Sequence, residues 1–254
     1  WLLLEGAAAC TRNDLFLRGN EPLTEEQELL YKDYLDKRVK RIPVQHILGV
    51  QNFCGLEFMV TPDVLCPRFD TEILIEEALK HIKPESSILD MCTGSGCIIL
   101  SLLHFTKNCT GTAADLSEKA LAVARRNAEK LGKTCEFIHS DLFENINGKY
   151  DVIISNPPYI ATKEIEALEP EVRIHEPMMA LDGMEDGLFF YRKIVSASKE
   201  FLNPDGWLFF EIGYDQGKAV SDMMIEAGYS VVQVIKDLAG LDRVVIGKLA
   251  QEER

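Results

Sequence analysis

Apolar and polar positions alternate along the chain in a way that predicts strands and helices in turn from residue 71 onward. Short apolar runs are typical of buried strands, whereas apolar residues at helical spacing are typical of amphipathic helices. The predicted strands cover residues 87–90, 110–115, 135–139, 151–155, 206–212, 230–236 and 243–249. The predicted helices cover residues 71–82, 97–105, 117–131, 187–202 and 216–227. Repeated strand–helix units predict a parallel α/β sheet with helices on both faces.

The last two predicted strands depart from this pattern, because only a short turn separates them. Parallel neighbours need a crossover of about a dozen residues, so these strands are expected to form an antiparallel hairpin at the sheet edge. A parallel α/β sheet that ends in an antiparallel hairpin is typical of the Rossmann-like fold of class I S-adenosylmethionine-dependent methyltransferases.

Residues 1–42 are predicted to form a small helical N-terminal domain. Its predicted helices cover residues 1–9 and 24–39, with a break at 20–22. Thr24 and Gln27 match a capping box, in which each side chain binds a backbone amide at the start of the helix. Because the chain begins at Trp1 within an apolar stretch, we expect further residues of this domain to precede it.

Two short apolar runs, 45–53 and 56–60, predict a β-hairpin around Cys54-Gly55. We therefore expect a hairpin linker over residues 43–67 and a main domain over residues 68–254.

Charge distinguishes between classes of partner. The chain has 27 basic and 41 acidic residues, a formal net charge of −14, which argues against a protein that holds nucleic acid through its phosphates. Hydrophobic residues make up 46% of the chain, too many for a disordered protein. No apolar run approaches the roughly 18 to 20 residues of a membrane span. The basic run Lys37–Arg41 is interpreted as a solvated helix face, the alternative being a site for an acidic protein surface or ribosomal RNA.

The seven cysteines predict neither a metal site nor a disulfide framework. No CxxC pair exists, and no cysteine and histidine residues have the spacing of zinc ligands. Scattered cysteines of odd number are typical of reduced, mostly buried thiols in an intracellular protein. We therefore predict no metal and a location in the bacterial cytoplasm.

A glycine-containing turn follows the first predicted strand of the sheet. Open α/β sheets bind ligands beyond the carboxyl ends of their strands, and glycines allow the backbone to approach a ligand closely. The predicted cofactor loop consists of Cys92, Thr93, Gly94, Ser95 and Gly96. A similar turn also occurs as an ordinary strand–helix connection. The lack of a Lys-Ser/Thr pair after the glycines excludes a phosphate loop.

Acidic residues end the next two predicted strands. Asp115 is placed to accept hydrogen bonds from both hydroxyls of a ribose, although a carboxylate there also stabilises a helix start beside Ser117. Asp141 is placed to accept from an adenine amino group, the alternative being an ordinary loop carboxylate. These features fit NAD and S-adenosylmethionine almost equally.

The fourth predicted strand runs directly into Asn156-Pro157-Pro158-Tyr159. Consecutive prolines fix two backbone angles and remove two donors, and the residue before a proline is extended, so we expect a rigid corner. The Asn156 side chain and the Pro157 carbonyl can each accept an N–H of a planar amide or amino group, on which Tyr159 can stack. This favours methylation of a weakly nucleophilic nitrogen by positioning and electrostatics. The plain alternative is a proline-stabilised turn.

This corner and the 90–96 loop together resemble the amino-methyltransferases of adenine, guanine and glutamine. Further segments narrow the resemblance to the HemK/PrmC-type protein-(glutamine-N5) methyltransferases. They are residues 41–49 (Arg-Ile-Pro-Val-Gln-His-Ile-Leu-Gly), 67–72 (Pro-Arg-Phe-Asp-Thr-Glu), 175–188 and 237–247. The resemblance covers essentially the whole chain, including its helical N-terminus.

The resemblance implies methyl transfer from S-adenosylmethionine, with S-adenosylhomocysteine as product, to the glutamine of the Gly-Gly-Gln motif of peptide chain release factors. The implied cofactor-binding residues are those of the 92–96 loop, Asp115, Asp141, Leu142 and Asn156. The implied substrate-binding residues are Asn156, Pro157, Pro158 and Tyr159, with Asn156, Pro157 and Tyr159 as the catalytic set. The helical domain would contact the release factor, and residues 68–254 would form the methyltransferase domain. We expect a monomer, no stable DNA or membrane binding, and at most an indirect contact with the ribosome.

Some residues depart from the family pattern. Cys92 stands where glycine is usual, and is expected to tighten the loop and to weaken cofactor binding if that position needs a positive φ. Phe69 replaces a proline and is expected to pack near the methionine end of the cofactor. His46 stands where tyrosine is common, and Leu142 replaces a tryptophan of some members.

Two other functions stay open at this point. One is an N6-adenine or N2-guanine nucleic-acid methyltransferase, which the net charge of −14 opposes. The other is a non-catalytic S-adenosylmethionine-binding scaffold, which Cys92 motivates. Arg68 and Glu72 are expected to form a framework pair at the site, and His175 to be a surface or packing residue.

Overall fold

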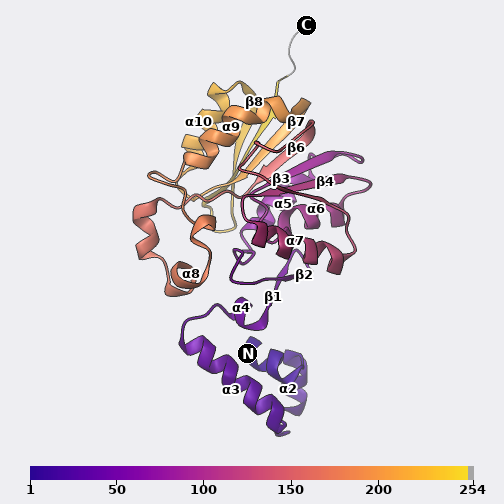
Figure 1. Cartoon of the computed structure of the whole chain (residues 1–254), viewed down its shortest axis with the longest axis vertical. Coiled ribbons are helices and arrows are strands. Elements are labelled where there is room, and N and C mark those ends of the chain that lie inside the picture. The colour runs from indigo at the N-terminus through magenta and orange to yellow at the C-terminus, as the bar shows by residue number, and fades with distance from the viewer. Residues whose placement is uncertain (251–254) are drawn as a thin grey trace.

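A seven-stranded sheet forms the centre of the computed structural model, which describes residues 1–250 except for the side chains of Leu15 and Arg18. The strand order is β5-β4-β3-β6-β7-β9-β8 (Figure 1). The strands are β3 (Ser87–Met91), β4 (Thr110–Asp115), β5 (Glu136–His139), β6 (Tyr150–Ser155), β7 (Leu202–Glu211), β8 (Tyr229–Lys236) and β9 (Asp242–Leu249). Neighbours from β5 to β7 are parallel, and β9 is antiparallel to both β7 and β8. The predicted C-terminal hairpin at the sheet edge is confirmed.

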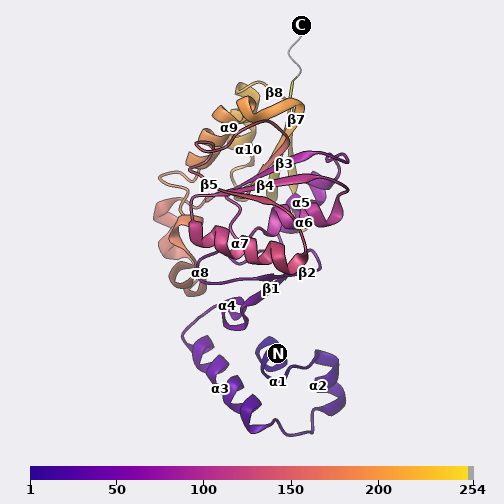
Figure 2. The same cartoon turned by 45° about the vertical axis from the view of Figure 1, so that its right-hand side comes forward.

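Helices cover both faces of the sheet (Figure 2). They are α5 (Thr71–Leu79), α6 (Cys97–Phe105), α7 (Glu118–Leu131), α9 (Phe189–Phe201) and α10 (Gly217–Glu226). Alternate residues of β6 belong to different cores: Val152 and Ile154 pack with α5 and α6, whereas Ile153 packs with α9 and α10. A strand buried on both faces requires this alternation. The predicted α/β sheet with helices on both faces is confirmed.

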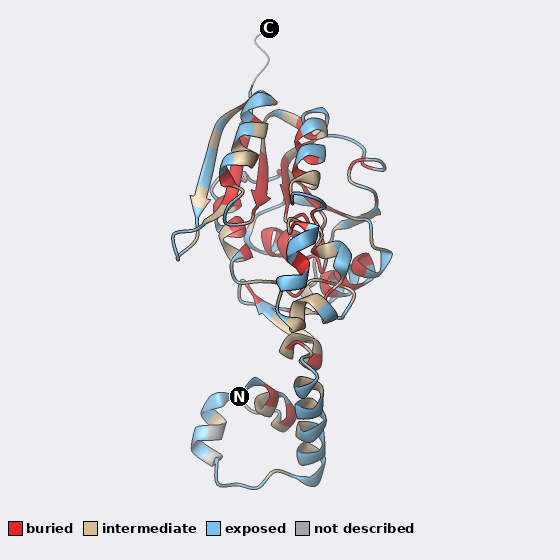
Figure 3. Ribbon diagram, turned by 90° about the vertical axis from the view of Figure 1, so that its left-hand side faces the viewer, coloured by how far each residue is buried: buried red, intermediate tan, exposed pale blue. Residues whose placement is uncertain are grey.

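The N-terminal helices lie together at one end of the molecule, away from the sheet, and are largely exposed (Figure 3). They are α1 (Leu2–Ala8), α2 (Arg12–Arg18) and α3 (Glu25–Val39). The predicted capping box of α3 is confirmed: the Gln27 amide donates to Thr24 Oγ1 at 3.3 Å, and the Thr24 amide donates to Gln27 Oε1 at 3.0 Å. Helix α3 has no fully buried residue, although it packs along α1.

The hairpin of β1 (Val50–Phe53) and β2 (Leu56–Met59) joins these helices to the sheet domain. Its turn residues, Cys54 and Gly55, both have positive φ angles, 49° and 73°, as tight hairpin turns require. The predicted hairpin is therefore confirmed in this part of the linker.

Some predictions of local structure are wrong. Residues 45–48 lie in the short helix α4 (Val44–Leu48) instead of a strand, because Pro43 precedes the helix and Gly49, at φ 74°, ends it. Two further α-helices were not predicted: α2, and α8 (Pro170–His175), which lies between the corner and α9. Both are too short and too polar to produce an apolar periodicity.

All seven cysteines are free, but only Cys66 and Cys97 are buried. The expectation that most of the thiols are buried is therefore wrong. Over residues 1–250, no helix is both long enough and apolar enough to cross a membrane.

Asn127 of α7 connects the hairpin to the loop after β3. Its side chain is fully buried. Its Oδ1 accepts from the Met59 amide at 2.7 Å, and its Nδ2 donates to the carbonyls of Met59 and Ser95 at 3.0 and 2.9 Å. One buried side chain thus provides hydrogen-bond partners for the backbone of two separate segments, the hairpin and the loop after β3.

We expect Asn127→Ala to lower the free energy of unfolding by about 3 kcal/mol, because it leaves buried backbone groups of Met59 and Ser95 without partners. Urea denaturation followed by circular dichroism measures this loss. Asn13→Ala, on the exposed surface of α2, is the matched control and should change stability by less than about 1 kcal/mol. Equal midpoints for the two variants would contradict the assigned role.

Candidate active site

The carboxyl ends of β3 and β6 lie side by side. Met91 pairs with Ser155 in parallel register, and the Ser155 hydroxyl donates to the Met91 carbonyl at 2.7 Å. The loop after β3 and the corner after β6 therefore meet at one edge of the sheet. A cavity of about 460 Å³ opens there, where open α/β sheets bind ligands.

Most residues predicted for the site line this cavity. They are Cys92, Thr93, Gly94, Ser95, Asp115, Asp141, Leu142, Asn156 and Pro158. Gly96, Pro157 and Tyr159 do not belong to the lining. Gly96 precedes α6 as its N-cap, Pro157 is buried and Tyr159 is half-buried.

Side-chain contacts from two strand ends hold the loop after β3. The Thr93 hydroxyl donates to Asp90 Oδ2 at 2.6 Å, and the Gly94 amide donates to Asp115 Oδ2 at 2.9 Å. Asp90 is fully buried, and this burial raises the pKa of its carboxyl to about 7. Cys92 has a φ of 62°. This is the positive φ under which, as stated above, glycine is favoured at this position. This left-handed conformation costs a non-glycine residue about 1–2 kcal/mol.

Asp115 has capacity left for a ligand. One oxygen accepts from Gly94 and the other accepts from the Ser117 amide at 2.8 Å. A carboxylate has about four acceptor positions, so further donors from the cavity can bind both oxygens. Burial raises the pKa of Asp115, and the hydrogen bonds from Ser117 and Gly94 oppose this. The helix-start role and the ligand role considered for Asp115 are thus compatible.

Contacts from other segments fix the corner after β6 in place. Asn156 Nδ2 donates to Thr71 Oγ1 in a long hydrogen bond of 3.5 Å. Gln216 Nε2 donates to the Tyr159 carbonyl at 3.0 Å. Gly187 has a φ of 73°, and a Cβ there would overlap the Tyr159 carbonyl oxygen. The backbone of the corner is therefore packed against other backbone, and this close approach requires glycine.

Glu211, at the end of β7, is a site residue that was not predicted. It is 2% exposed, and burial raises the pKa of its carboxyl to about 7, while Thr71 and the charge of Arg243 act in the opposite direction. The signal for it was present in the sequence, because an acidic residue ends an apolar strand at the same edge as Asn156. Glu211 thus places a buried carboxyl at the same sheet edge as the corner.

Two expectations around residues 68–72 are wrong. Arg68 lines the cavity but pairs with Glu176 at 2.6 Å, whereas Glu72 accepts from the Cys54 amide at 2.7 Å and anchors the hairpin. They do not form a pair. Phe69 is 69% exposed and does not belong to the cavity lining, so it does not pack near a bound cofactor in this structure.

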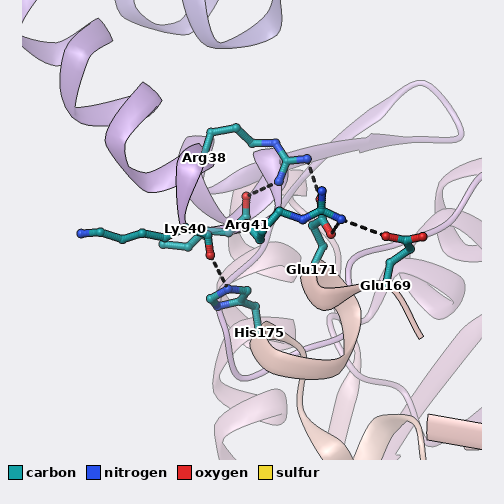
Figure 4. Close-up of polar contacts among 7 residues, drawn as sticks. Arg38, Lys40, Arg41, Glu169, Glu171 and His175 are labelled. Carbon is teal, nitrogen blue, oxygen red and sulfur yellow. Dashed lines mark hydrogen bonds and ion pairs between the residues drawn. The ribbon is translucent and has the colours of Figure 1, made fainter. Parts of the chain in front are cut away.

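Ion pairs connect the end of α3 to α8, as Figure 4 shows. Arg38 binds Glu171 at 2.6 Å. Arg41 binds Glu169 at 2.8 Å and Glu171 at 2.7 Å. We call Arg38, Arg41, Glu169 and Glu171 the α3–α8 clasp. It fixes the helical N-terminus against a segment that follows the Asn-Pro-Pro-Tyr corner.

The run Lys37–Arg41 is partly or fully exposed, in agreement with the interpretation as a solvated helix face, but its two arginines also bind carboxylates of the same chain. They are also engaged and not available as a free basic site for a partner. His175 confirms its predicted packing role: its Nε2 lies 3.1 Å from the Lys40 carbonyl oxygen, at the clasp and not in the cavity lining (Figure 4).

Two family models match the chain: the PrmC N-terminal domain over residues 1–49 and the methyltransferase small domain over residues 67–184. The release factor glutamine methyltransferase of Geobacter sulfurreducens is 43% identical over 248 residues, covering 97% of this chain and 87% of that protein. The release factor glutamine methyltransferase of Caulobacter vibrioides is 42% identical over 252 residues, with coverages of 97% and 87%.

Among solved structures, a methyltransferase from Pyrococcus furiosus superposes with a TM-score of 0.61, covering 85% of this chain and 98% of that chain. It is 19% identical in sequence, so this likeness shows the fold alone.

Glycine is usually less stabilising than alanine, but the left-handed backbone at Cys92 predicts the opposite order at this position. Cys92→Gly and Cys92→Ala both remove the sulfur, so their difference reports the backbone. We expect the glycine variant to be more stable by about 1 kcal/mol in urea denaturation. Ala122→Gly on the exposed surface of α7 is the control, where glycine should cost about 1 kcal/mol. A Cys92→Ala variant as stable as Cys92→Gly would refute strain at this position.

The raised pKa of Glu211 predicts a pH dependence of stability. The native carboxyl keeps its proton up to about pH 7, whereas an ordinary glutamate loses it near 4.5. The native state therefore binds more protons across this window, and the free energy of unfolding falls as pH rises. We expect Glu211→Gln to reduce that fall between about pH 5 and 7 by about 2 kcal/mol.

Urea denaturation at a series of pH values measures this slope. Asp90 contributes in the same direction, so part of the slope should persist in Glu211→Gln. The exposed Glu200→Gln on α9 is the matched control. A slope equal to that of the wild type in Glu211→Gln would show that Glu211 is ionised in the native state at low pH.

Proposed function

This chain belongs to the release factor glutamine methyltransferase family, and on that premise we propose that it methylates the side-chain amide nitrogen of a glutamine in peptide chain release factors. The methyl donor is S-adenosylmethionine, and the target is the glutamine of the Gly-Gly-Gln motif. The observation that carries the proposal is the convergence of the 92–96 loop and the Asn156 corner on one cavity of about 460 Å³.

The cavity lining fits a nucleoside bearing an amino-acid chain. Asp115 accepts the ribose hydroxyls, for which it has free acceptor positions, and Asp141 accepts from the adenine amino group. Leu142 supplies an apolar contact, and the backbone of the 92–96 loop approaches the nucleoside closely. When bound, S-adenosylmethionine supplies an electrophilic methyl group and leaves as S-adenosylhomocysteine.

Asn156 and Pro157 position the target amide. The Asn156 amide nitrogen is directed to Thr71, which leaves its oxygen for an N–H of the glutamine. The Pro157 carbonyl accepts the second N–H, and the Tyr159 ring stacks on the amide plane. Burial raises the pKa of the Tyr159 phenol, so Tyr159 acts by packing and not as a base. The amide nitrogen forms a bond to the methyl carbon as the carbon–sulfur bond breaks, and its proton leaves to solvent.

The helical domain, residues 1–42, recognises the release factor in this proposal. Large apolar side chains are exposed on α2 and α3, which is typical of protein-binding surfaces. They are Phe16, Leu17, Leu29, Leu35 and Val39.

Several expectations from the sequence stay predictions. They are the linker over residues 43–67, the methyltransferase domain over 68–254, the monomeric state and the cytoplasmic location. So does an indirect contact with the ribosome.

Removing the Asn156 amide should slow methyl transfer about 100- to 1000-fold, because the site loses the group that orients and stabilises the reacting nitrogen. Transfer of a labelled methyl group from S-adenosylmethionine to purified release factor measures the rate for Asn156→Ala. We expect kcat to fall with little change in the affinity for release factor, since the helical domain is intact.

Asn147→Ala, in an exposed loop, is the control and should retain the wild-type rate. A release factor whose target glutamine is replaced by alanine should accept no methyl group. An unchanged rate for Asn156→Ala would refute the mechanism, and methylation of duplex DNA by the same preparation would favour the nucleic-acid alternative.

A further inference from the structure

Side chains from separate segments converge at the junction between the helical N-terminus and the sheet domain. His46 belongs to α4, Cys66 lies between β2 and α5, and Glu176 ends α8. One ring nitrogen of His46, the Cys66 sulfur and a carboxylate oxygen of Glu176 all lie within 4.8 Å of one another. No sequence spacing reveals this set, because the fold alone brings its members together.

The surroundings of His46 indicate that a binding partner is missing from this set. Both of its ring nitrogens are inaccessible to solvent, and neither has a partner of good hydrogen-bond geometry among the described residues. An unpartnered buried polar group costs about 1–3 kcal/mol, and an ion is one of the accepted explanations for such a group. Burial is the largest influence on the pKa of His46 and lowers it, against a weaker opposite effect of the Val64 backbone.

Glu176 is held in a fixed position beside the histidine and the thiol. Its side chain is 0% exposed and pairs through Oε2 with Arg68 at 2.6 Å. Its Oε1 accepts from the Cys66 amide at 3.3 Å. Metal-ligating carboxylates are usually oriented by such outer contacts. Arg68 binds Oε2, and the single amide donor at Oε1 leaves that oxygen a second acceptor position, which can bind a cation.

A second cavity, of about 230 Å³, adjoins the set. Glu176 and Arg68 belong to its lining, and its other walls come from α1, α3, α4 and α8. Because the Glu176 side chain is 0% exposed, a cation that enters from this cavity reaches the carboxylate through a local opening of the junction.

We propose that His46, Cys66 and Glu176 form a binding site for a divalent, borderline-soft cation, Zn²⁺ being the one that best fits a nitrogen, sulfur and oxygen donor set. Ligand atoms of zinc lie about 2.0–2.3 Å from the metal, which is a tighter set than the 4.8 Å within which these atoms lie, so side-chain rotations accompany binding. Binding replaces the Cys66 thiol proton, which leaves to solvent, by a metal–sulfur bond.

The metal would join α4, the segment before α5 and the end of α8. Without metal, burial and the charge of Glu176 keep Cys66 as a thiol by raising its pKa to about 12, so the apoprotein is a folded state with its own thiol–carboxylate contact. The cation therefore stiffens a junction that exists without it. This site lies outside the methyl-transfer cavity, and the inference does not depend on the proposed function.

Titration of the full chain, free of affinity tags, with Co²⁺ tests the proposal. We expect one equivalent to bind and to produce the charge-transfer absorption of a cobalt–thiolate bond, which Zn²⁺ then abolishes by displacing the cobalt. Cys66→Ser should remove this absorption and weaken metal binding at least about 100-fold, the upper end of the loss seen for outer-shell changes alone. His46→Gln should weaken it similarly while leaving the thiol in place.

Cys135→Ser is the matched control, because burial raises the pKa of the Cys135 thiol to about 12 as well and it does not belong to the set. It should retain the cobalt spectrum. Zn²⁺ should also raise the thermal midpoint of the wild type and of Cys135→Ser, but not of His46→Gln. Absence of the thiolate absorption in the wild type, or its persistence in a folded Cys66→Ser variant, overturns the proposal.

Discussion

Hydrogen bonds between β3 and β6 bring together two strand ends that lie 64 residues apart in the chain. Every other feature of the cavity depends on this parallel pairing. It sets the loop that begins at Cys92 against the corner that begins at Asn156, and β7 then adds Glu211 from the other side. The pairing is stable because β6 is buried on both faces by separate apolar cores, so the site rests on rigid elements.

Most of the sheet domain was predictable, because its strands are short apolar runs and its helices are amphipathic. Helix α6 and strand β4 match their predicted ranges, and the cavity contains most of the predicted residues. The prediction failed where tertiary contacts decide the structure. Arg68 binds a carboxylate 108 residues away and not that of its near neighbour Glu72. Helix α8 has no apolar periodicity of its own. Pairings of this kind leave no local signal in a single sequence.

The junction between the helical N-terminus and the sheet domain depends on polar contacts more than on apolar burial. The arginines of the α3–α8 clasp and Arg68 all bind carboxylates of residues 169–176. Exposed ion pairs contribute little to stability, about 0–1 kcal/mol each, but Glu171 binds both Arg38 and Arg41, and this shared contact sets the orientation of the two segments. The clasp therefore determines the direction in which α3 leaves the sheet domain more than it strengthens the fold.

The two prolines of the corner have a chemical consequence of their own. Pro157 and Pro158 have no N–H, and the Asn156 amide nitrogen is turned toward Thr71. The two prolines therefore contribute carbonyl oxygens and no hydrogen-bond donor to the corner. A primary amide brings two hydrogens on its nitrogen, whereas a carboxylate brings only lone pairs and negative charge. The prolines thus favour an approaching amide over an approaching carboxylate through the donors that they lack.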